Sequence, residues 1–313
     1  MRKSFILSIL LAFLLAFPCG AGIKVMSYNV RNGVAKDGDN SWELRKEATS
    51  AMLDDVNPDV FGVQEAYDFQ IKYIAESCPR YKAIGVGRDD GKSKGEHMSI
   101  FYNEDRIELI DWGTYWLSET PDKVSKGWDA ACYRTATWAL MCEKSTGRRF
   151  FYVNTHLDHK GVVARKEGLA LLHRKISEMN PNGLPMILTG DFNVLPDNPG
   201  LEDINRLMKS ARFNCVEGDS FGSFNGFGSM GRSKGAPTLE NADLDSLTPI
   251  DYIYYSGFDF CTEFRVVTKT YAGKPYISDH YPIWANLVDK SELSGRDARR
   301  ARRHCSCCRN RAR

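Results

Sequence analysis

Short apolar runs, most of them closed by a polar residue, recur along the chain. Their length and their β-branched or aromatic content predict buried strands at residues 23–29, 60–64, 98–102, 136–141, 150–154, 186–189, 251–255 and 281–287. Residues 42–56 and 162–179 instead place apolar side chains three or four positions apart, which predicts helices, and residues 69–75 predict a further one. Helices separate some of these strands and short links separate others. This order predicts an α/β (α+β) fold of mixed sheets covered by helices.

Side chains that can bind metals or transfer protons stand at the ends of several predicted strands. They are Asn29, Glu65, His156, Asp191, Asn193, Asp279 and His280. Any turn residue can close a strand, so packing alone does not explain this choice. A site that gathers at the strand ends of a layered fold does explain it. Taken singly, Asn29 could begin a loop, Asp191 and Asn193 could form a turn, and His280 could be a hydrogen-bonded core histidine.

Oxygen ligands dominate this set of side chains. Carboxylate and amide oxygens favour hard cations, so Mg²⁺ or Mn²⁺ is expected in preference to Zn²⁺, with Ca²⁺ as a further candidate. Hydrolysis of a phosphate ester needs a Lewis acid, a positioned water and stabilisation of the leaving oxygen. The set can supply all three, which makes phosphoester hydrolysis the predicted chemistry.

The first residues have the character of a secretory signal peptide. Arg2 and Lys3 precede a nearly unbroken apolar run from position 5 to 17, and small residues follow it. We therefore expect residues 1–21 to be a leader, with the mature protein secreted or periplasmic and without a transmembrane span. Cys19 raises lipidation as the alternative, but Phe17 and Pro18 form a poor lipidation site.

Residues 291–313 differ in composition from the rest of the chain. They hold eight Arg with Cys305, Cys307 and Cys308 among them, have no apolar periodicity, and are predicted to be a disordered tail. Without this tail and without Arg2 and Lys3, the 42 basic and 40 acidic residues become 32 and 38. An acidic body argues against strong non-specific binding of nucleic acid, whereas the tail could bind an anionic surface or simply be solvated. Residues 22–290 are predicted to form one catalytic domain.

Six strings of residues, in order along nearly the whole body, resemble the endonuclease/exonuclease/phosphatase superfamily. They are Ser27-Tyr28-Asn29-Val30-Arg31, Val63-Gln64-Glu65, Asn154-Thr155-His156-Leu157-Asp158-His159, Gly190-Asp191-Phe192-Asn193, Ile250-Asp251-Tyr252-Ile253 and Ser278-Asp279-His280-Tyr281-Pro282-Ile283. Each string alone is weak, but six in the family's order are specific. The resemblance is to a secreted bacterial-type member, and it implies a four-layer sandwich of two mixed β-sheets flanked by helices.

The resemblance also implies a role for each residue of the site. Glu65 would be the main metal carboxylate with Asn29 beside it, and Asp279 would help to hold the metal. The remaining residues would act on water and phosphate: Asp191 and Asn193 on the attacking water, His156 and His280 on the phosphoryl oxygens, and Asp251 as the acceptor that orients one histidine. Apart from the resemblance, Asp158 and His159 follow His156 and could simply shape the loop there.

Two positions resemble the deoxyribonuclease branch of the superfamily. Glu96 would orient a catalytic histidine, and Arg134 would clamp a phosphate through its planar guanidinium. Pro249 stands where the family commonly has Arg, and His97 where small or polar residues are usual, which bears on substrate contacts. Residues 222–248, rich in Gly, Ser and Asn, are expected to form a surface loop near the site.

The predicted function is hydrolysis of phosphate esters by in-line attack of water, in the manner of a phosphodiesterase or nuclease. A phosphomonoesterase or lipid-headgroup phosphatase on the same fold is one alternative. A non-catalytic protein that binds an anionic ligand is another, although the complete ligand set argues against it. The substrate is accordingly expected among nucleic acids, lipid headgroups and small phosphodiesters.

Overall fold

The computed structural model describes residues 22–230 and 244–293 of the 313-residue chain. The predicted leader at residues 1–21 lies outside the described residues, as do residues 294–313 of the predicted tail and residues 231–243 of the Gly-rich connection. Among the described residues, no helix combines the length and the apolar character that crossing a bilayer requires.

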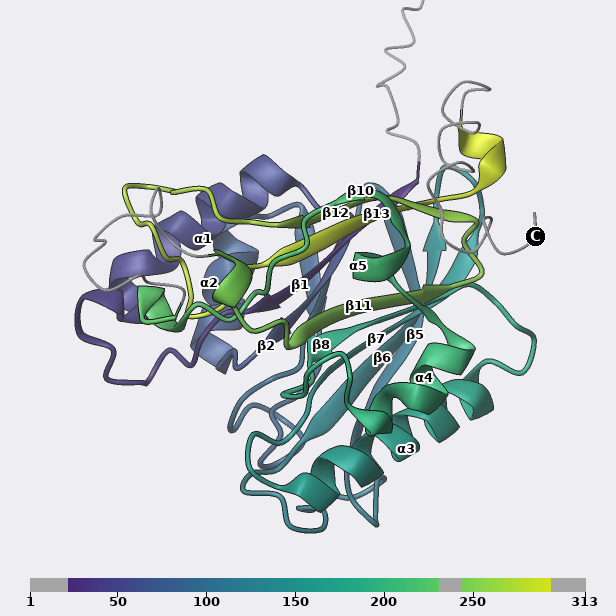
Figure 1. The fold of residues 1–313 in the computed structure, drawn as a ribbon, viewed down its shortest axis with the longest axis horizontal. Helices are drawn as coiled ribbons and strands as arrows, with labels where there is room; N and C mark the ends of the chain where they lie inside the picture. The colour runs from purple at the N-terminus through teal and green to yellow at the C-terminus, as the bar shows by residue number, and fades with distance from the viewer. Residues whose placement is uncertain (1–21, 231–243, 294–313) are drawn as a thin grey trace, which may run out of the picture.

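The described strands form two mixed β-sheets that lie face to face (Figure 1). The first sheet has the order β10-β12-β13-β1-β2-β4-β3. Its strands are β1 (Ile23–Asn29), β2 (Val60–Gln64), β3 (Tyr81–Ile84), β4 (Ile100–Asn103), β10 (Cys215–Gly218), β12 (Phe260–Val266) and β13 (Ile283–Val288). The second sheet has the order β5-β6-β7-β8-β11-β9. Its strands are β5 (Ile107–Trp116), β6 (Thr135–Glu143), β7 (Arg149–His156), β8 (Met186–Asp191), β9 (Lys209–Ser210) and β11 (Asp251–Ser256).

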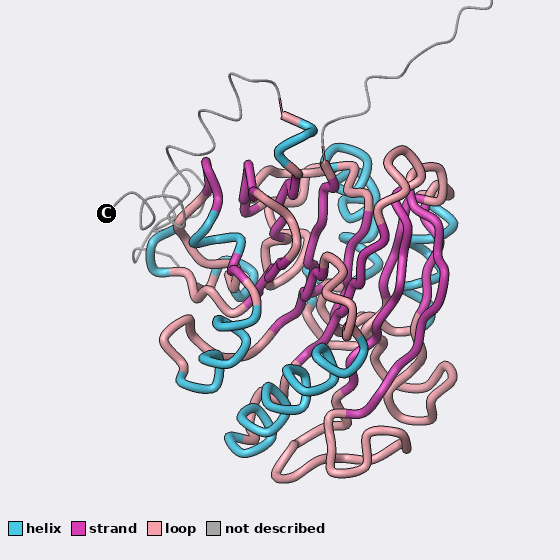
Figure 2. Tube along the Cα trace, turned by 90° about the vertical axis from the view of Figure 1, so that its right-hand side faces the viewer, coloured by secondary structure: helices cyan, strands magenta, loops and turns pink. Residues whose placement is uncertain are grey.

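Helices cover the outer faces of both sheets (Figure 2). The first sheet carries α1 (Trp42–Val56) and α2 (Asp68–Ser77), and the second carries α3 (Val162–Met179) and α4 (Glu202–Leu207). The one-turn α5 (Ala211–Asn214) packs at the sheet interface through Ala211. Short 3-10 turns complete the described helical segments: η1 (Gly38–Asn40), η2 (Pro199–Leu201), η3 (Gly226–Gly228), η5 (Leu244–Ser246) and η6 (Lys290–Glu292). The predicted sandwich of two mixed sheets flanked by helices is confirmed.

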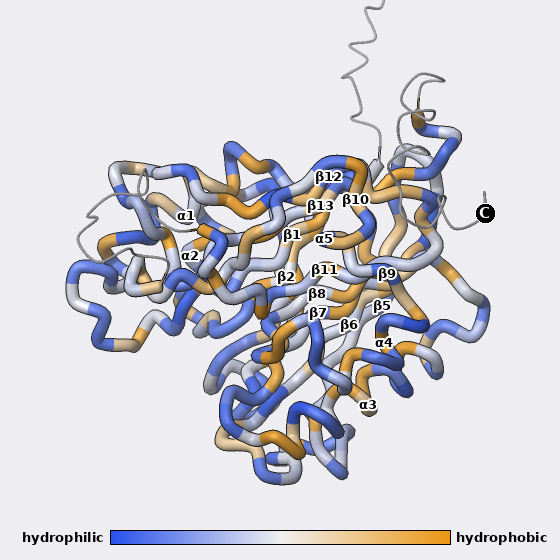
Figure 3. Tube along the Cα trace, in the orientation of Figure 1, coloured by the Kyte–Doolittle hydropathy of each residue, from blue (hydrophilic) through white to orange (hydrophobic). Residues whose placement is uncertain are grey.

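The central strands are buried on both faces, which explains their unbroken apolar sequence. In β7, Phe150 and Tyr152 pack between the sheets, whereas Phe151 and Val153 face the helical layer of α3. Hydrophobic residues accordingly concentrate along the strands of both sheets (Figure 3). A strand with only one buried face would alternate instead.

The two longest predicted helices have the predicted bounds, but not every apolar residue in them joins the core. Val162 and Val163 are 68% and 47% exposed because they lie in the first turn of α3, where the Asp129 carboxylate accepts from the backbone amide of Ala164 at 2.7 Å. Leu44, in the first turn of α1, is 51% exposed. The first turn of each helix therefore has an exposed face, although Trp42 of α1 and Ala164 of α3 are buried.

Several strands escaped the sequence analysis. Strand β5 lies at the edge of its sheet, so charged residues such as Glu108 and Asp111 interrupt its apolar pattern. The short strands β3, β9 and β10 also lie at or beside sheet edges, and β12 mixes polar with apolar residues. A strand at a sheet edge is not buried on both faces. It therefore lacks the unbroken apolar run from which the other strands were predicted.

A buried amide joins the two sheets beneath the strand ends. Asn154 of β7 donates to the carbonyl oxygens of Val63 at 2.8 Å and Ser99 at 3.2 Å, and it accepts from Gln64 Nε2 at 2.7 Å. The sheets approach so closely here that a Cβ on Gly62 would lie 2.3 Å from the Asn154 side chain. Glycine at this position thus permits the contact between the strands that carry the site.

Strand direction brings the predicted site residues to one edge of the sandwich. Strands β1 and β2 run parallel, as do β7 and β8, so the residues at their carboxyl ends lie together. Strand β11 runs antiparallel to β8, which places its first residue, Asp251, opposite Asp191. Strand β13 runs antiparallel to β1, so the segment just before Ile283 reaches the end of β1.

Candidate active site

A cavity of about 490 Å³ opens where these strand ends meet. It is lined by predicted site residues from both sheets, namely Glu65, Glu96, Arg134, His156, Asp191, Asn193, Asp279 and His280. Asn29 and Asp251 do not line it but hydrogen-bond to residues that do. The structure therefore brings all the predicted residues to one place.

The amide of Asn29 bridges carboxylates that come from different sheets. Its Nδ2 donates to Glu65 Oε1 at 3.0 Å and to Asp191 Oδ2 at 3.1 Å. The other oxygen of Glu65, Oε2, accepts from the backbone amide of Asn32 at 3.0 Å. Glu65 itself has a φ of +62°, an uncommon conformation for a residue other than glycine. The surrounding hydrogen bonds thus hold the carboxylate in a backbone conformation that it would not adopt freely.

Arg31 supplies positive charge to the same carboxylates. Its Nη1 lies 3.9 Å from Glu65 Oε2 and 3.5 Å from Asp279 Oδ2, and its Nη2 pairs with Asp37 at 3.0 Å. Arg31 also has a positive φ, of 59°. A cationic group therefore already lies between Glu65 and Asp279.

Side chains of this cluster fit a divalent cation. Glu65, His156 and Asp191 each offer one ligand atom, and these atoms lie within 4.8 Å of one another. Two of the three ligands are carboxylates, which are the donors that hard divalent cations favour.

Asp191 lies at the centre of the histidine cluster. Its Oδ2 is 3.5 Å from His156 Nε2 and 3.7 Å from His280 Nε2, and its Oδ1 accepts from the backbone amide of Asn193 at 3.0 Å. Burial, reinforced by the negative charge of Asp251, raises the pKa of Asp191 to about 7. A carboxyl group whose pKa lies near neutrality is suited to accept a proton at working pH.

The two histidines differ in protonation. Burial alone would lower the pKa of His280, but Asp251 and Asp191 raise it to about 10. Its Nδ1 bonds Asp251 Oδ2 at 2.7 Å, and the same oxygen accepts from the Ser223 hydroxyl at 2.6 Å. Burial, followed by the positive charge of Arg134, holds the pKa of His156 well below its ordinary value. His280 is therefore cationic and His156 neutral near pH 7.

The tautomer of His156 follows from its neighbours. Asn193 Nδ2 donates to the Leu157 carbonyl at 3.0 Å and lies 3.1 Å from His156 Nε2. Since the amide nitrogen can only donate, Nε2 accepts and the ring proton lies on Nδ1. This buried Nδ1 has no partner among the described residues.

Among the described residues, the Glu96 carboxylate has no hydrogen bond to a histidine. The carboxylate pairs with Arg88 Nη1 and lies 3.4 Å from Asn32 Nδ2. The physical reason is that the guanidinium of Arg88, on the same loop, is always charged and binds a carboxylate more strongly than a neutral imidazole does. The orienting acceptor that the structure does show is Asp251, on His280.

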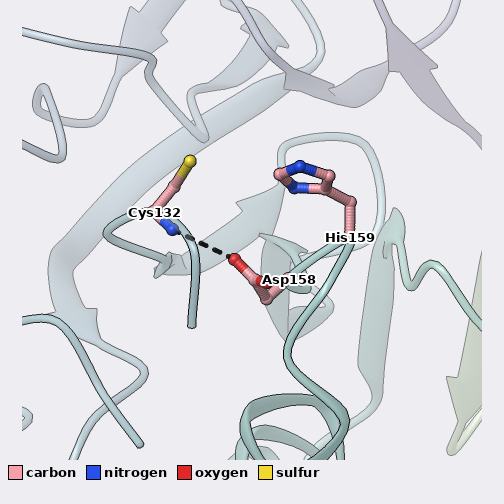
Figure 4. Close-up of side chains that lie close together, drawn as sticks. All are labelled: Cys132, Asp158 and His159. Carbon is pink, nitrogen blue, oxygen red and sulfur yellow. Dashed lines mark hydrogen bonds between the residues drawn. The ribbon is translucent and has the colours of Figure 1, made fainter. Parts of the chain in front are cut away.

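Arg134 borders the cavity and is anchored from behind. Its Nε donates to Asp158 Oδ2 at 3.2 Å, and its Nη2 lies 3.0 Å from His159 Nδ1. Asp158 also accepts from the backbone amides of Cys132, Lys160 and, at 2.8 Å, Gly161. Figure 4 shows Cys132 and His159 on either side of Asp158, with the thiol and the imidazole directed toward the same side. Asp158 and His159 therefore do more than shape a loop, because they fix a guanidinium at the cavity wall.

Sequence reasoning missed several residues of this site. Arg31, Arg88 and Phe224 line the cavity, and Ser223 supports the Asp251–His280 pair. Arg31 belongs to the string Ser27-Tyr28-Asn29-Val30-Arg31, so its place in that string could have indicated a role in the site. Arg88 and Ser223 lie in loops between strands, where no periodicity marks them.

The chain is similar to a known family and to solved structures of that family. The profile of the Endonuclease/Exonuclease/phosphatase family matches residues 26–280. A solved endonuclease/exonuclease/phosphatase family protein from Bacteroides thetaiotaomicron is 35% identical, with a TM-score of 0.75, covering 85% of this chain and 97% of that one. A mannosyl-6-phosphatase from the same organism is 36% identical, also with a TM-score of 0.75, covering 85% of this chain and 99% of that one.

A more distant similarity is to the 3'-5'-exoribonuclease subunit Ccr4 of the Kluyveromyces lactis CCR4-Not complex. The identity is 24% over 309 residues and covers 81% of this chain. The match spans only 38% of that longer protein. This similarity extends the sequence relationship to a nuclease.

Proposed function

Because the chain belongs to the endonuclease/exonuclease/phosphatase family, we propose that it hydrolyses small phosphate esters, with a phosphorylated sugar as the first candidate substrate. The observation that carries the proposal is the position of Asp191. This carboxyl group contacts Asn29 from the first sheet and lies within 4 Å of both histidines, so the site can act on a water and on a phosphoryl group together.

The residues divide the work of the reaction among themselves. Glu65 and Asp279, with Asn29 beside them, would hold Mg²⁺ or Mn²⁺, which when bound supplies a Lewis acid for the phosphoryl oxygen. Asp191 takes the proton of the attacking water, and its pKa of about 7 suits that task. The cationic His280, held by Asp251, donates to a phosphoryl oxygen as negative charge develops on it.

A small leaving group is favoured by the cavity and by charge. A space of about 490 Å³ suits one phosphorylated sugar. The body of the chain is acidic once the basic tail is set aside, which disfavours a long polyanion. The mannosyl-6-phosphatase named above is similar to this chain over 99% of its own length.

A phosphodiester substrate is the second candidate. It is favoured by the similarity to Ccr4 and by Phe224, whose ring borders the cavity with its centroid 5.0 Å from that of His280. An aromatic ring at this position could stack on a nucleotide base.

Cleavage of defined substrates separates these candidates, followed by phosphate release for the sugar ester, p-nitrophenol release for the two nitrophenyl esters and shortening of the RNA. We expect mannose 6-phosphate and p-nitrophenyl phosphate to be hydrolysed in Mg²⁺ or Mn²⁺, and bis-p-nitrophenyl phosphate and single-stranded RNA to be poor substrates. Faster cleavage of the diesters than of either monoester would reverse the order of the two candidates.

Two further proposals concern the ends of the chain. We propose that residues 1–21 direct export to the periplasm or the medium, and that the basic residues beyond position 290 bind an anionic surface. Fractionation of cells that produce the full chain tests the first, and vesicle binding tests the second.

A further inference from the structure

Arg134 determines which ring nitrogen of His159 carries the proton. The Nη2 of Arg134 lies 3.0 Å from His159 Nδ1. A guanidinium has no acceptor and stays protonated at any pH the protein meets, so Nδ1 must be the acceptor. His159 is therefore neutral and carries its proton on Nε2. Burial, followed by Arg134, also lowers the pKa of this imidazole, in agreement with that assignment.

Arg134 holds His159 at the cavity wall from a buried position. Its side chain is only 5% exposed, and two of its three nitrogens bond Asp158 and His159. The third nitrogen, Nη1, is buried without a partner among the described residues. Arg134 and His159 both line the cavity, whereas Asp158 lies behind them and does not.

The same cluster could at first sight be a cation site, since Cys132, Asp158 and His159 offer atoms within 4.8 Å of one another. The contacts argue against that. Asp158 Oδ2 and His159 Nδ1 are both engaged by the Arg134 guanidinium, whose charge would repel a metal ion. What His159 offers at the cavity wall is thus a donor, its Nε2–H, which suits an anion.

We propose that the Nε2–H of His159, whose ring Arg134 holds in place, binds a phosphoryl oxygen and so makes the site selective for phosphomonoesters. A monoester dianion carries one more anionic oxygen than a diester. Glu65, Asp279 and His280 serve the reacting side of the phosphoryl group, and His159 offers a donor for that additional oxygen. This inference rests on the proposed function, because it assigns a contact to the phosphate ester.

Two substitutions of one residue separate substrate contact from support of Arg134. His159→Asn keeps an oxygen near the position of Nδ1, so it can still accept from Arg134, but it lacks the outer donor. His159→Gln extends an amide to about the reach of Nε2 and loses the inner acceptor. His173→Ala, on helix α3 away from the cavity, is the matched control for loss of a histidine. Thermal unfolding of all variants shows whether they fold alike.

Binding of inorganic phosphate, measured by calorimetry with and without Mg²⁺, gives a readout that needs no turnover. We expect His159→Asn to weaken phosphate binding about tenfold or more, the size of one hydrogen bond to a charged group. His159→Gln should stay within about threefold of the wild type, and His173→Ala should not differ from it. The ratio of kcat/KM for p-nitrophenyl phosphate to that for bis-p-nitrophenyl phosphate should fall in His159→Asn, through a higher KM for the monoester.

Each other outcome decides against the inference. Unchanged phosphate binding in His159→Asn, equal loss in the Asn and Gln variants, or no phosphate binding by the wild type would overturn it. Failure of the proposed function looks different, because the wild type would then bind phosphate but hydrolyse no ester.

Discussion

Replacing Asn154 with Leu should destabilise the fold through lost hydrogen bonds, without creating a cavity, because the two side chains are similar in volume. Asn154 is fully buried and makes short contacts with Val63, Ser99, Gln64 and, at 3.1 Å, Thr189. Leucine can replace none of them. The substitution therefore tests whether a polar network holds the two sheets together beneath the site.

The magnitude follows from which groups keep a second partner. The Ser99 carbonyl still accepts from the backbone amide of Val63 at 2.9 Å. The Thr189 hydroxyl still donates to the Tyr152 hydroxyl at 3.0 Å. The Gln64 amide loses its contact with Asn154 at 2.7 Å but keeps the Ser27 hydroxyl at 3.2 Å, whereas the Val63 carbonyl loses its contact with Asn154 at 2.8 Å. At about 1–3 kcal/mol for a buried group that loses its partner, the free energy of unfolding should fall by about 1–3 kcal/mol.

Urea unfolding followed by tryptophan fluorescence measures this free energy. Asn182→Leu, at an exposed position in the turn after α3, is the control and should change stability by less than about 0.5 kcal/mol. A loss of less than about 0.5 kcal/mol in Asn154→Leu would refute the reasoning, since the network would then contribute nothing that apolar contact cannot replace.

Three further predictions address the site, the sheet interface and the tail. Asp251→Asn removes the charge that holds His280 protonated, so kcat for p-nitrophenyl phosphate should fall about tenfold or more, and an unchanged kcat would contradict that role. Gly62→Ala should lower stability by about 1–3 kcal/mol because its Cβ would lie 2.3 Å from the Asn154 side chain, and an unchanged melting temperature would show that the sheets can separate. Deletion of residues 294–313 removes eight Arg and should abolish binding to anionic vesicles while turnover of small esters persists, and retained vesicle binding would place that surface elsewhere.

The parts of the fold that could be predicted are those with two-sided burial. Strands such as β7 and β8 are unbroken apolar runs because one face meets the other sheet and the opposite face meets α3. Their polar ends, His156 and Asp191, were conspicuous for the same reason. Strand β5 was not predicted because it is an edge strand, and charged residues on its open side interrupt the apolar run.

The parts of the site that could not be predicted depend on pairing between loops. Glu96 was expected to meet a histidine, but its carboxylate pairs with Arg88, and the sequence does not show that these two side chains lie within reach of each other. His159 was set aside as a loop residue, although Arg134, 25 positions earlier, fixes its ring. Contacts of this kind are decided by tertiary packing, which residue spacing along the chain does not encode.

The central claim is that Asp191 and the neighbouring carboxylates carry out cation-dependent hydrolysis of a phosphate ester. The direct test is release of p-nitrophenol from p-nitrophenyl phosphate by the wild type and by Asp191→Asn, each assayed after EDTA treatment and again after addition of Mg²⁺ or Mn²⁺. The account predicts wild-type activity that EDTA removes and the cation restores, with a loss of at least about a hundredfold in the folded variant. Full activity in EDTA, or in Asp191→Asn, would contradict it.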